Sequence, residues 1–414
     1  MRKSSLNKIK SPDYHRGFFF MEKIVIIGGG AFGLWCAYLL KKKGYSPIIF
    51  DQNKRLGAKL LVAGKGGFNL SRHPEALDYS LLGNSASFLK QLYSNYSPLH
   101  FADDLTELGF PIYYGSSSKM FPKDTKPSLL VNSLIAQLKK EDVKLKHQLI
   151  GLSPKENTAI FTKNTGEKII YKYDHLIMGL GSKSWPITGS DGKWLPLIQD
   201  TFQWDLPPFQ AANCRIYFDT NFLEFAQEME GNPLKNLVFM GGEMEITKGE
   251  AVILKNGMEG NAVYPLIPIL RRQLQKTGEA HFSINLKPRL SSEQWEHHLK
   301  TKGKKSWSKL LLSVKIPKEI HPLFHYNRLV NKTESLLVKI PISGFGSVEE
   351  SISNSGGIPL SHLTSDLAHP TYPNHYFGGE MLDWEAPTGG YLLQACFSMA
   401  HKVVDKISKN LETI

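Results

Sequence analysis

The chain has few of the residues that build metal sites and disulfide frameworks. Its 414 residues include three cysteines, Cys36, Cys214 and Cys396, and none of them falls in a CxxC pair or at a spacing typical of metal ligands. The sequence also lacks HExxH and Walker A motifs, the signatures of zinc hydrolases and nucleoside triphosphatases. We therefore expect no metal centre, and we regard these two functions as poorly supported.

Long apolar runs are also missing. No stretch reaches the ~18 residues that a membrane-spanning helix needs. Residues 1–20 lack the apolar centre of a signal peptide, so we interpret them as a loose basic extension before a fold that begins at Met21. We expect a cytoplasmic protein with no membrane partner. Its hydrophobic content of 41% is typical of globular proteins, and 414 residues favour two or three domains.

Acidic residues are outnumbered, and the formal net charge at pH 7 is +12. Such an excess favours an anionic partner: a nucleic acid, an anionic lipid or a phosphorylated substrate. Part of the excess is local, because residues 1–20 carry five basic residues and one acidic residue. A second cluster of lysines surrounds Trp307, namely Lys300, Lys302, Lys304, Lys305 and Lys309. A solvated surface is the simpler interpretation of both clusters, and an RNA-binding patch is the alternative.

What the sequence does contain is a glycine-rich turn between a predicted strand and a predicted helix. Residues 24–27 are apolar and mostly β-branched, and residues 34–40 have a helical apolar pattern. Between them, Gly28, Gly30 and Gly33 match G-x-G-x-x-G in the strand–helix context that gives this motif its meaning. The first glycine permits a tight turn, the second permits close approach of a pyrophosphate, and the third permits close helix packing.

A second predicted strand, residues 47–50, ends in Asp51, which lies 23 residues after Gly28. An acidic residue at this position accepts hydrogen bonds from the ribose of an adenosine. The order of strand, glycines, helix, strand and acid therefore predicts dinucleotide binding. The alternative is a glycine-rich turn in an ordinary βαβ unit.

The rest of the first half alternates predicted loops with regular elements. Residues 56–71 hold four glycines and two lysines, a composition that predicts a loop close to a ligand, with a flexible surface loop as the alternative. The apolar patterns predict helices at 86–92, 103–108 and 128–139, the last with a serine cap, and a loop at 113–122. They also predict strands at 143–150, 159–161, 168–171 and 175–178.

The sequence changes character near residue 190. Short strand candidates at 214–218, 237–240, 242–247 and 251–254 predict a small antiparallel sheet or barrel, followed by partly helical stretches at 262–276 and 291–330. A strand at 336–340 and a final helix at 392–407 complete the pattern. We predict an α/β fold with a discontinuous Rossmann-type domain, residues 21–190 and 340–414, and an inserted β-rich, barrel-like and partly helical domain, residues 191–339.

Several motifs resemble the BaiN/RdsA family of FAD-dependent oxidoreductases. They are IIGGGAFG at 26–33, GAKLLVAGKGGFNLS at 57–71, GLGSKSWPITGSDG at 179–192, SNSGGIPLS at 353–361 and GGEMLDWEAPTGGYLLQ at 378–394. The last block is the most specific, and the resemblance covers most of residues 21–414. It implies an FAD-binding Rossmann domain interrupted by an inserted domain.

The resemblance also implies roles for individual residues. The motif glycines would hold the FAD pyrophosphate, Asp51 the ribose, the loop 57–69 the flavin, and the segment before the last helix the pyrophosphate, the ribityl chain and the ring. The implied cofactor-binding residues are Gly28, Gly29, Gly30, Ala31, Phe32, Gly33, Asp51, Gln52, Lys59, Gly66, Gly67, Asn69, Gly179, Gly181, Gly379, Glu380, Asp383, Gly389, Gly390 and Tyr391.

One position departs from the family pattern. Much of the family has Arg-Cys-Asn where this chain has Gly67-Phe68-Asn69, and glycine where it has Lys65. The missing cysteine removes the obvious thiol acid beside the flavin. Asn69 and Tyr391 by position, and Lys65 by charge, are the remaining candidates for a catalytic proton donor.

These features favour an FAD-dependent oxidoreductase with a small-molecule substrate. NAD(P)H is the expected electron donor, and because no second nucleotide-binding motif is evident it would dock directly at the ring; the alternative is an oxidase whose flavin is reduced by the substrate. One alternative is reduction of a uridine in ribosomal RNA, an activity known in the family, and the other is a non-enzymatic FAD-binding protein. The oligomeric state stays open.

Overall fold

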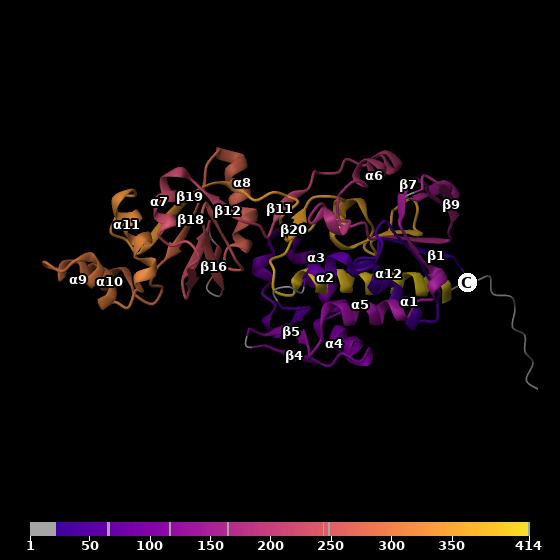
Figure 1. Cartoon of the computed structure of the whole chain (residues 1–414), viewed down its shortest axis with the longest axis horizontal. Helices are drawn as coiled ribbons and strands as arrows, with labels where there is room; N and C mark the ends of the chain where they lie inside the picture. The colour runs from indigo at the N-terminus through magenta and orange to yellow at the C-terminus, as the bar shows by residue number, and fades with distance from the viewer. Residues whose placement is uncertain are drawn as a thin grey trace, which may run out of the picture.

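The computed structural model describes residues 22–63, 67–115, 117–163, 165–242, 244–246 and 249–412. The predicted basic extension, Lys65 and Gly66 therefore lie outside the described residues. Within the described ranges, two lobes lie along the long axis of the molecule (Figure 1). The Rossmann lobe comprises residues 22–209 and 356–412, and the inserted lobe comprises residues 213–346.

A parallel sheet forms the centre of the Rossmann lobe, in the order β21-β10-β1-β2-β6. Its central strands are buried runs of β-branched and other apolar residues, as is typical of a parallel sheet that is covered on both faces. The strands are β1 (Ile24–Ile27), β2 (Ile48–Asp51), β6 (Val143–Leu145), β10 (His175–Met178) and β21 (His375–Phe377). The predicted strand–glycine–helix–strand unit is confirmed.

Two long helices, α1 (Ala31–Lys42) and α12 (Tyr391–Glu412), run side by side against this sheet (Figure 1). The ring of Phe397 lies 4.9 Å from Trp35 and 4.4 Å from Phe101, centroid to centroid. Each such buried side chain contributes about 1.5–3 kcal/mol of transfer free energy. The remaining helices of this lobe are α2 (Ala58–Ala63), α3 (Ala86–Asn95), α4 (Pro98–Glu107), α5 (Pro127–Ala136) and α6 (Leu195–Phe202).

Two small antiparallel sheets flank the lobe. One contains β3 (Ser71–Arg72), β5 (Lys119–Pro122) and β4 (Ile112–Tyr114), and the other contains β7 (His147–Ser153), β8 (Thr158–Lys163) and β9 (Lys168–Lys172). The strands predicted at 159–161 and 168–171 are confirmed, and they pair antiparallel as β8 and β9. The loop predicted at 113–122 is wrong, because β4 and β5 pair there and bury Met120.

Three local predictions also need correction. Residues 58–63 of the predicted ligand loop form α2, whose Leu60 is buried in the core. Helix α5 has Lys126 at its N-cap and Pro127 in its first turn, so Ser128 is not the cap. The strand predicted at 143–150 is two strands in different sheets, separated at Lys146, which has a left-handed φ of 59°.

The inserted lobe is built on an eight-stranded sheet, in the order β13-β16-β17-β12-β19-β18-β14-β15, in which every pairing is antiparallel. The predicted antiparallel sheet is therefore confirmed. Its strands are β12 (Ile216–Phe218), β13 (Pro233–Lys235), β14 (Val238–Gly241), β15 (Met244–Ile246), β16 (Glu250–Leu254), β17 (Gly257–Glu259), β18 (Ala280–Asn285) and β19 (Leu337–Phe345). Its helices are α7 (Thr220–Gln227), α8 (Ile267–Thr277), α9 (Ser292–Lys300), α10 (Trp307–Ser313) and α11 (His321–Leu329).

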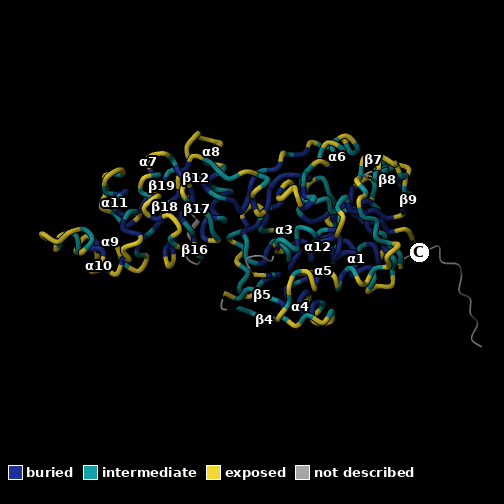
Figure 2. Tube along the Cα trace, in the orientation of Figure 1, coloured by how far each residue is buried: buried dark blue, intermediate teal, exposed yellow. Residues whose placement is uncertain are grey.

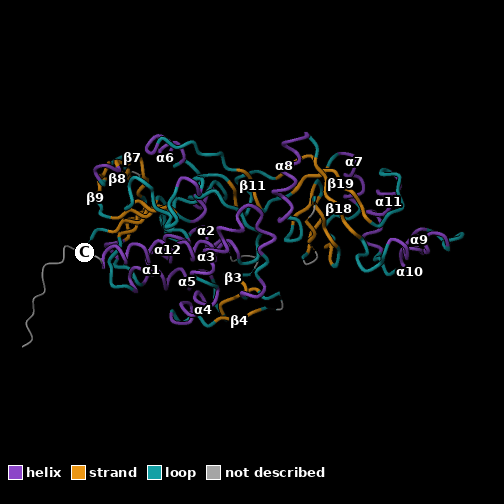
Figure 3. Tube along the Cα trace, turned by 180° about the vertical axis from the view of Figure 1, so that it is seen from behind, coloured by secondary structure: helices purple, strands orange, loops and turns teal. Residues whose placement is uncertain are grey.

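Two antiparallel strands, β11 (Gln210–Ala212) and β20 (Ser353–Ser355), connect the lobes (Figure 3). The buried apolar side chains form two clusters, one in each lobe. Figure 2 shows that both lobes contain buried segments. Residues 195–209 pack into the Rossmann cluster, whereas β19 belongs to the inserted sheet. The domain boundary predicted after residue 339 falls within β19. The sequence pattern predicted a strand here, but it did not show that the strand joins the inserted sheet.

Candidate functional site

A cavity of about 450 Å³ opens at the carboxyl end of the parallel sheet. Ligands of doubly wound folds bind at this edge, and the volume lies within the usual range of small-molecule sites. The structure brings twelve of the predicted cofactor residues onto its wall: Gly28, Gly29, Gly30, Ala31, Phe32, Asp51, Gln52, Lys59, Gly179, Gly181, Gly379 and Glu380.

The motif glycines are required for three different reasons. Gly28 has φ of +100°, and a Cβ there would lie 2.2 Å from the carbonyl oxygen of Gly179. A Cβ on Gly33 would lie 1.9 Å from the carbonyl oxygen of Gly28, so Gly33 packs beneath the turn. A Cβ on Gly30, in contrast, would meet no atom within 4 Å. The space beside Gly30 is therefore open to the cavity, as expected where a pyrophosphate approaches the backbone.

The amino end of α1 supplies the electrostatic side of this cradle. Gly30 is its N-cap residue and provides no side-chain cap, and the first turn contains no acidic residue. The N–H groups at a helix start carry a partial positive charge and are ready donors to an anion. This end of the cavity therefore favours a phosphate.

Asp51 lies at the opposite side of the same turn. Its Oδ2 accepts a hydrogen bond from the Gly29 N–H at 2.7 Å, and its Oδ1 accepts one from the Asn53 N–H at 2.7 Å. Burial raises the pKa of the Asp51 carboxyl, and these two hydrogen bonds partly offset the increase. Next to it, Gln52 Nε2 donates to the carbonyl oxygen of Gly189 at 2.7 Å. Asp51 is thus held in position on the cavity wall.

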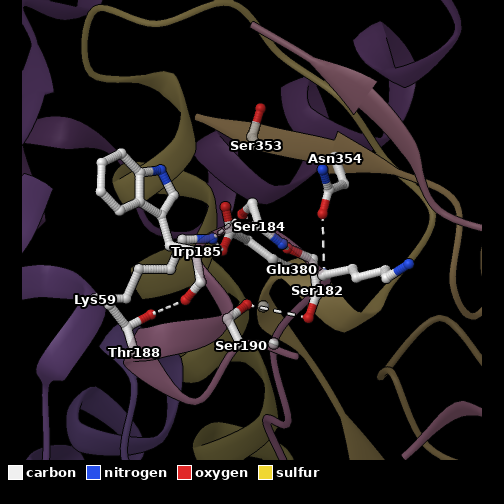
Figure 4. A network of polar contacts seen from close by, with 12 residues as sticks. Lys59, Ser182, Ser184, Trp185, Thr188, Ser190, Ser353, Asn354 and Glu380 are labelled. Atoms are coloured by element: carbon white, nitrogen blue, oxygen red, sulfur yellow. Dashed lines mark hydrogen bonds and ion pairs between the residues drawn. The ribbon is translucent and has the colours of Figure 1, made fainter. Parts of the chain in front are cut away.

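A polar network that sequence reasoning missed closes the other wall (Figure 4). Lys59 Nζ lies 2.5 Å from Glu380 Oε2 and also contacts the Ser184 hydroxyl. Ser184 is fully buried and lies 3.2 Å from the Ser182 hydroxyl, while Ser190 donates to the Ser182 carbonyl at 3.1 Å. The family-like segment 179–192 contains these serines, but only the fold shows that they face α2. The network joins α2 to the loop after β21.

Several predicted residues do not line the cavity. Tyr391 is fully buried, and its hydroxyl accepts a hydrogen bond from the Asp78 N–H at 2.9 Å. Asp383 Oδ1 accepts one from the Gly356 N–H at 2.7 Å. A Cβ on Gly390 would lie 2.4 Å from the carbonyl carbon of Ser71, so this glycine packs on β3. The predicted site residues that are described and lie outside the cavity wall are Gly33, Gly67, Asn69, Asp383, Gly389, Gly390 and Tyr391.

Of the three candidate proton donors, Lys65 lies outside the described residues, and the other two differ in their surroundings. Burial raises the pKa of the Tyr391 hydroxyl, which is already hydrogen-bonded away from the cavity. Asn69 Oδ1 is buried and has no hydrogen-bond partner in the described part of the chain. A buried acceptor without a partner is costly, which makes Asn69 the stronger candidate for a contact with a bound group.

The segment before α12 also joins the lobes. Arg271 of α8 forms a two-pronged ion pair with Glu385, with Nη2–oxygen distances of 3.1 and 2.8 Å, and its Nη1 donates to the Ala211 carbonyl at 2.8 Å. Asn213 Nδ2 donates to the Ala386 carbonyl at 2.7 Å. A small cavity of about 20 Å³ borders Glu385 at this junction. The inserted lobe thereby holds the chain that leads into Gly389 and Gly390.

Two classes of feature are not found among residues 22–412 outside the gaps given above. No group of three or more His, Cys, Asp or Glu side chains is arranged to hold a metal ion. No helix there is long and apolar enough to cross a membrane.

Comparisons with known proteins agree with this geometry. Residues 22–405 match the family model described as HI0933-like protein Rossmann domain. The ribosomal RNA dihydrouridine synthase of Escherichia coli strain K12 is 22% identical over 393 residues, covering 91% of this chain and 95% of its own length. The protein of the same name from Haemophilus influenzae is 22% identical over 413 residues, covering 93% and 98%.

Among solved structures, the open conformation of a flavocytochrome c3 fumarate reductase is similar, with a TM-score of 0.50 and 10% identity. The match covers 94% of this chain and 78% of that chain. At this identity the similarity concerns the fold alone, and it supports the Rossmann-type architecture with a second lobe.

The cavity fits FAD on the structure's own evidence. The open space at Gly30 and the uncapped start of α1 suit a pyrophosphate, and Asp51 suits a ribose. When bound, FAD supplies the redox chemistry, while the protein orients and tunes it. The resemblance noted in the sequence is confirmed, and the alternative of a non-enzymatic FAD-binding protein is not supported. The chain belongs to the HI0933-like family and is an FAD-dependent oxidoreductase.

Proposed function

We propose that NAD(P)H docks directly at the flavin ring and that the electrons then pass to a small-molecule acceptor. The observation that supports this route is the sheet topology. In the described residues, one sheet is parallel and follows a G-x-G-x-x-G turn, and all the other sheets are antiparallel. A separate Rossmann domain for NAD(P)H is therefore missing from this part of the chain, so a nicotinamide that reduces the flavin would reach the ring directly.

The junction between the lobes is the proposed entrance for the acceptor. The segment 385–390 contacts the inserted lobe through Arg271 and Asn213, and it leads into the start of α12. An acceptor placed here would lie between the two lobes, which is a common position for small-molecule sites.

Anaerobic absorbance of the FAD-loaded protein tests this proposal. We expect loss of the oxidised flavin band within seconds after addition of NADH or NADPH. A band that stays oxidised with both donors would contradict NAD(P)H as the electron source. A reduced flavin that is reoxidised by a panel of quinones and unsaturated acids would then identify the acceptor class.

A second candidate function is reduction of a uridine in ribosomal RNA. Two relatives that align over more than nine-tenths of this chain carry the name ribosomal RNA dihydrouridine synthase. The charge distribution also favours it. Residues 287–332 contain eleven Lys and Arg against three Glu, a net charge of +8, and residues 1–20 contribute +4. These two segments account for the entire net charge of +12, so the rest of the chain is neutral overall.

The basic segment 287–332 includes α9, α10 and α11 at the outer end of the inserted lobe (Figures 1 and 2). None of its cations forms a salt bridge with a described carboxylate. Lys302 Nζ lies 4.6 Å and Arg328 Cζ 5.1 Å from the centroid of the Trp307 ring. The indole therefore contacts the chain's own cations, and we propose contacts to RNA phosphates here rather than base stacking.

Removal of four exposed lysines tests the RNA candidate. The variant Lys300→Gln/Lys304→Gln/Lys305→Gln/Lys309→Gln should bind a fluorescein-labelled ribosomal RNA hairpin at least about tenfold more weakly. Its binding should also depend less on salt, because each lost phosphate contact lowers the slope of log K against log[salt] by about 0.9. Fluorescence anisotropy at several salt concentrations measures both quantities.

A matched control removes the same charge from the Rossmann lobe, at the exposed residues Lys139, Lys140, Lys155 and Lys168. This control should bind the hairpin within about twofold of the unmodified protein, because its lysines lie outside the basic segment. Equal losses in both variants would show that general charge explains the binding.

The cytoplasmic location also stays a prediction.

A further inference from the structure

Two cations lie directly opposite each other on neighbouring strands. Arg72 of β3 pairs with Lys119 of β5 in an antiparallel register, so both side chains are on the same face of the small sheet. Like charges in directly opposite positions destabilise a sheet. Neither cation forms a salt bridge with a carboxylate in the described part of the chain. The pairing of these two cations therefore has an electrostatic cost that no described salt bridge offsets.

The surroundings of Arg72 leave part of its guanidinium without a partner. Its Nη2 donates to the Ser117 carbonyl at 3.3 Å, while its Nε is buried and has no hydrogen-bond partner in the described ranges. Its Cζ lies 5.4 Å from the centroid of the Tyr391 ring, which positions the planar group against the first residue of α12. The guanidinium is therefore only partly hydrogen-bonded within the described part of the chain.

Lys119 is half-buried beside it. Burial lowers the pKa of the Lys119 amine, the nearby Arg72 charge lowers it further, and Glu250 of the inserted lobe acts in the opposite direction. Glu250 itself pairs with Lys235 at 3.0 Å. Lys119 thus lies within electrostatic reach of the inserted lobe.

Both cations converge on Gly389. A Cβ on this glycine would lie 3.2 Å from Arg72 Nη1 and 3.6 Å from Lys119 Cε. Gly389 and Gly390 both have φ of +104°, and α12 starts at the next residue with no acidic side chain in its first turn. The positive end of a 22-residue helix is therefore added to two side-chain cations at one place.

We propose that Arg72 and Lys119 bind an anionic group of the substrate, a carboxylate or a phosphate, beside Gly389 at the start of α12. An anion there would contact Arg72 Nη1, neutralise the repulsion between the two cations and interact with the helix end. This inference rests on the proposed function, because it assigns the acceptor that enters between the lobes to the class of anions. A carboxylate would come from an acidic small molecule, and a phosphate from a phosphorylated one or from RNA.

Thermal unfolding of the FAD-loaded protein tests the inference. Increasing concentrations of inorganic phosphate or of acetate should raise the melting temperature, because a ligand that binds only the folded state stabilises it. In the variant Arg72→Gln/Lys119→Gln this increase should be lost, with the dissociation constant weakened by at least about tenfold. The anion that raises the melting temperature at the lower concentration, phosphate or acetate, is the one that the site prefers.

A second measurement separates a binding role from a structural one. Without any added anion, Lys119→Gln alone should melt about 1–3 °C higher than the unmodified protein, because the repulsion is removed. A residue that only supports the fold would lower the melting temperature when replaced. The control variant Lys123→Gln, at an exposed lysine just after β5, should change neither the melting temperature nor the anion response.

The outcomes are distinct. No response to either anion, or an equal response in the double variant, would overturn the inference, as would destabilisation by Lys119→Gln. Flavin reduction by NAD(P)H is measured separately on the same samples. Failure of that reduction with an intact anion response would contradict the proposed electron donor and leave the anion site standing.

Discussion

The two lobes of this molecule use their residues in opposite ways. In the Rossmann lobe, function depends on positions that have no side chain. A Cβ on Gly28 or Gly33 would collide with the backbone, and a side chain on Gly30 would fill open space in the cavity. In the inserted lobe, the distinctive feature is an excess of side-chain charge, +8 within residues 287–332. A cofactor site of fixed shape demands particular residues at particular places, whereas a charged surface tolerates many arrangements.

The largest effect is expected from a test that places one substitution in each lobe. Both substitutions are at glycines where an added Cβ would have the same free space. Neither Gly30 nor Gly344 of β19 would bring a Cβ within 4 Å of another atom. Gly30→Val should fold normally but bind FAD more than about 100-fold more weakly, because its side chain would occupy the space of the pyrophosphate. Fluorescence titration of the apoprotein with FAD measures this effect.

Gly344→Val serves as the control and should keep both FAD affinity and stability. Circular dichroism of each apoprotein checks that the fold is intact. If Gly30→Val bound FAD normally, the cavity would not be the pyrophosphate site.

A second test concerns pH, because the stability of the Rossmann lobe is expected to fall in acid. Burial lowers the pKa of the His375 imidazole from 6.5 to about 4, with smaller contributions from His369 and His175. His375 is fully buried and contacts the Tyr173 hydroxyl at 2.7 Å. The unfolded chain binds a proton that the folded chain does not, so stability is lost as the pH falls from about 6.5 to about 4.

The full shift corresponds to about 3 kcal/mol. His375→Gln should therefore flatten the dependence of the unfolding free energy on pH over this window, which urea titrations at several pH values measure. The exposed His297 of α9 offers a control, and its replacement by Gln should leave the pH dependence unchanged. An unaltered slope in His375→Gln would show that other groups cause the acid sensitivity.

The smallest effect is expected at the contact between the lobes. Arg271→Gln leaves Glu385 without its ion-pair partner, and the two side chains are only 13% and 21% exposed. We expect a loss of about 1–3 kcal/mol, measured by urea unfolding, because a largely buried charge is left unpaired. Lys235→Gln breaks the exposed pair with Glu250 and should cost less than about 1 kcal/mol. Equal losses would mean that the junction contact has no special role.

Much of the Rossmann lobe was predictable because its signals are local. The apolar run before Gly28, the spacing of the three glycines and the position of Asp51 each follow from neighbouring residues. The loop predicted at 113–122 was wrong for the opposite reason, because β5 forms only by pairing with β4 on one edge and β3 on the other. Pairing of this kind depends on partners that are distant in sequence.

The candidate site divides in the same way. Sequence spacing identified the residues at the pyrophosphate end. The family resemblance placed Tyr391 at the flavin, whereas its hydroxyl is buried against Asp78. No local pattern showed that Lys59 would meet Glu380 and Ser184, which are more than a hundred residues away. The pairing of Arg72 with Lys119 was likewise invisible before the strands were placed.

By itself, the sequence determined the class of cofactor, because a dinucleotide turn needs glycines at fixed spacing next to a strand, and backbone sterics permit little else. It also determined the sign and location of the excess charge. Only the tertiary structure decided which strands share a sheet, which lobe residues 195–209 join and which polar groups face the cavity. These features result from contacts between distant segments, whose free energy is gained only when the whole chain is folded.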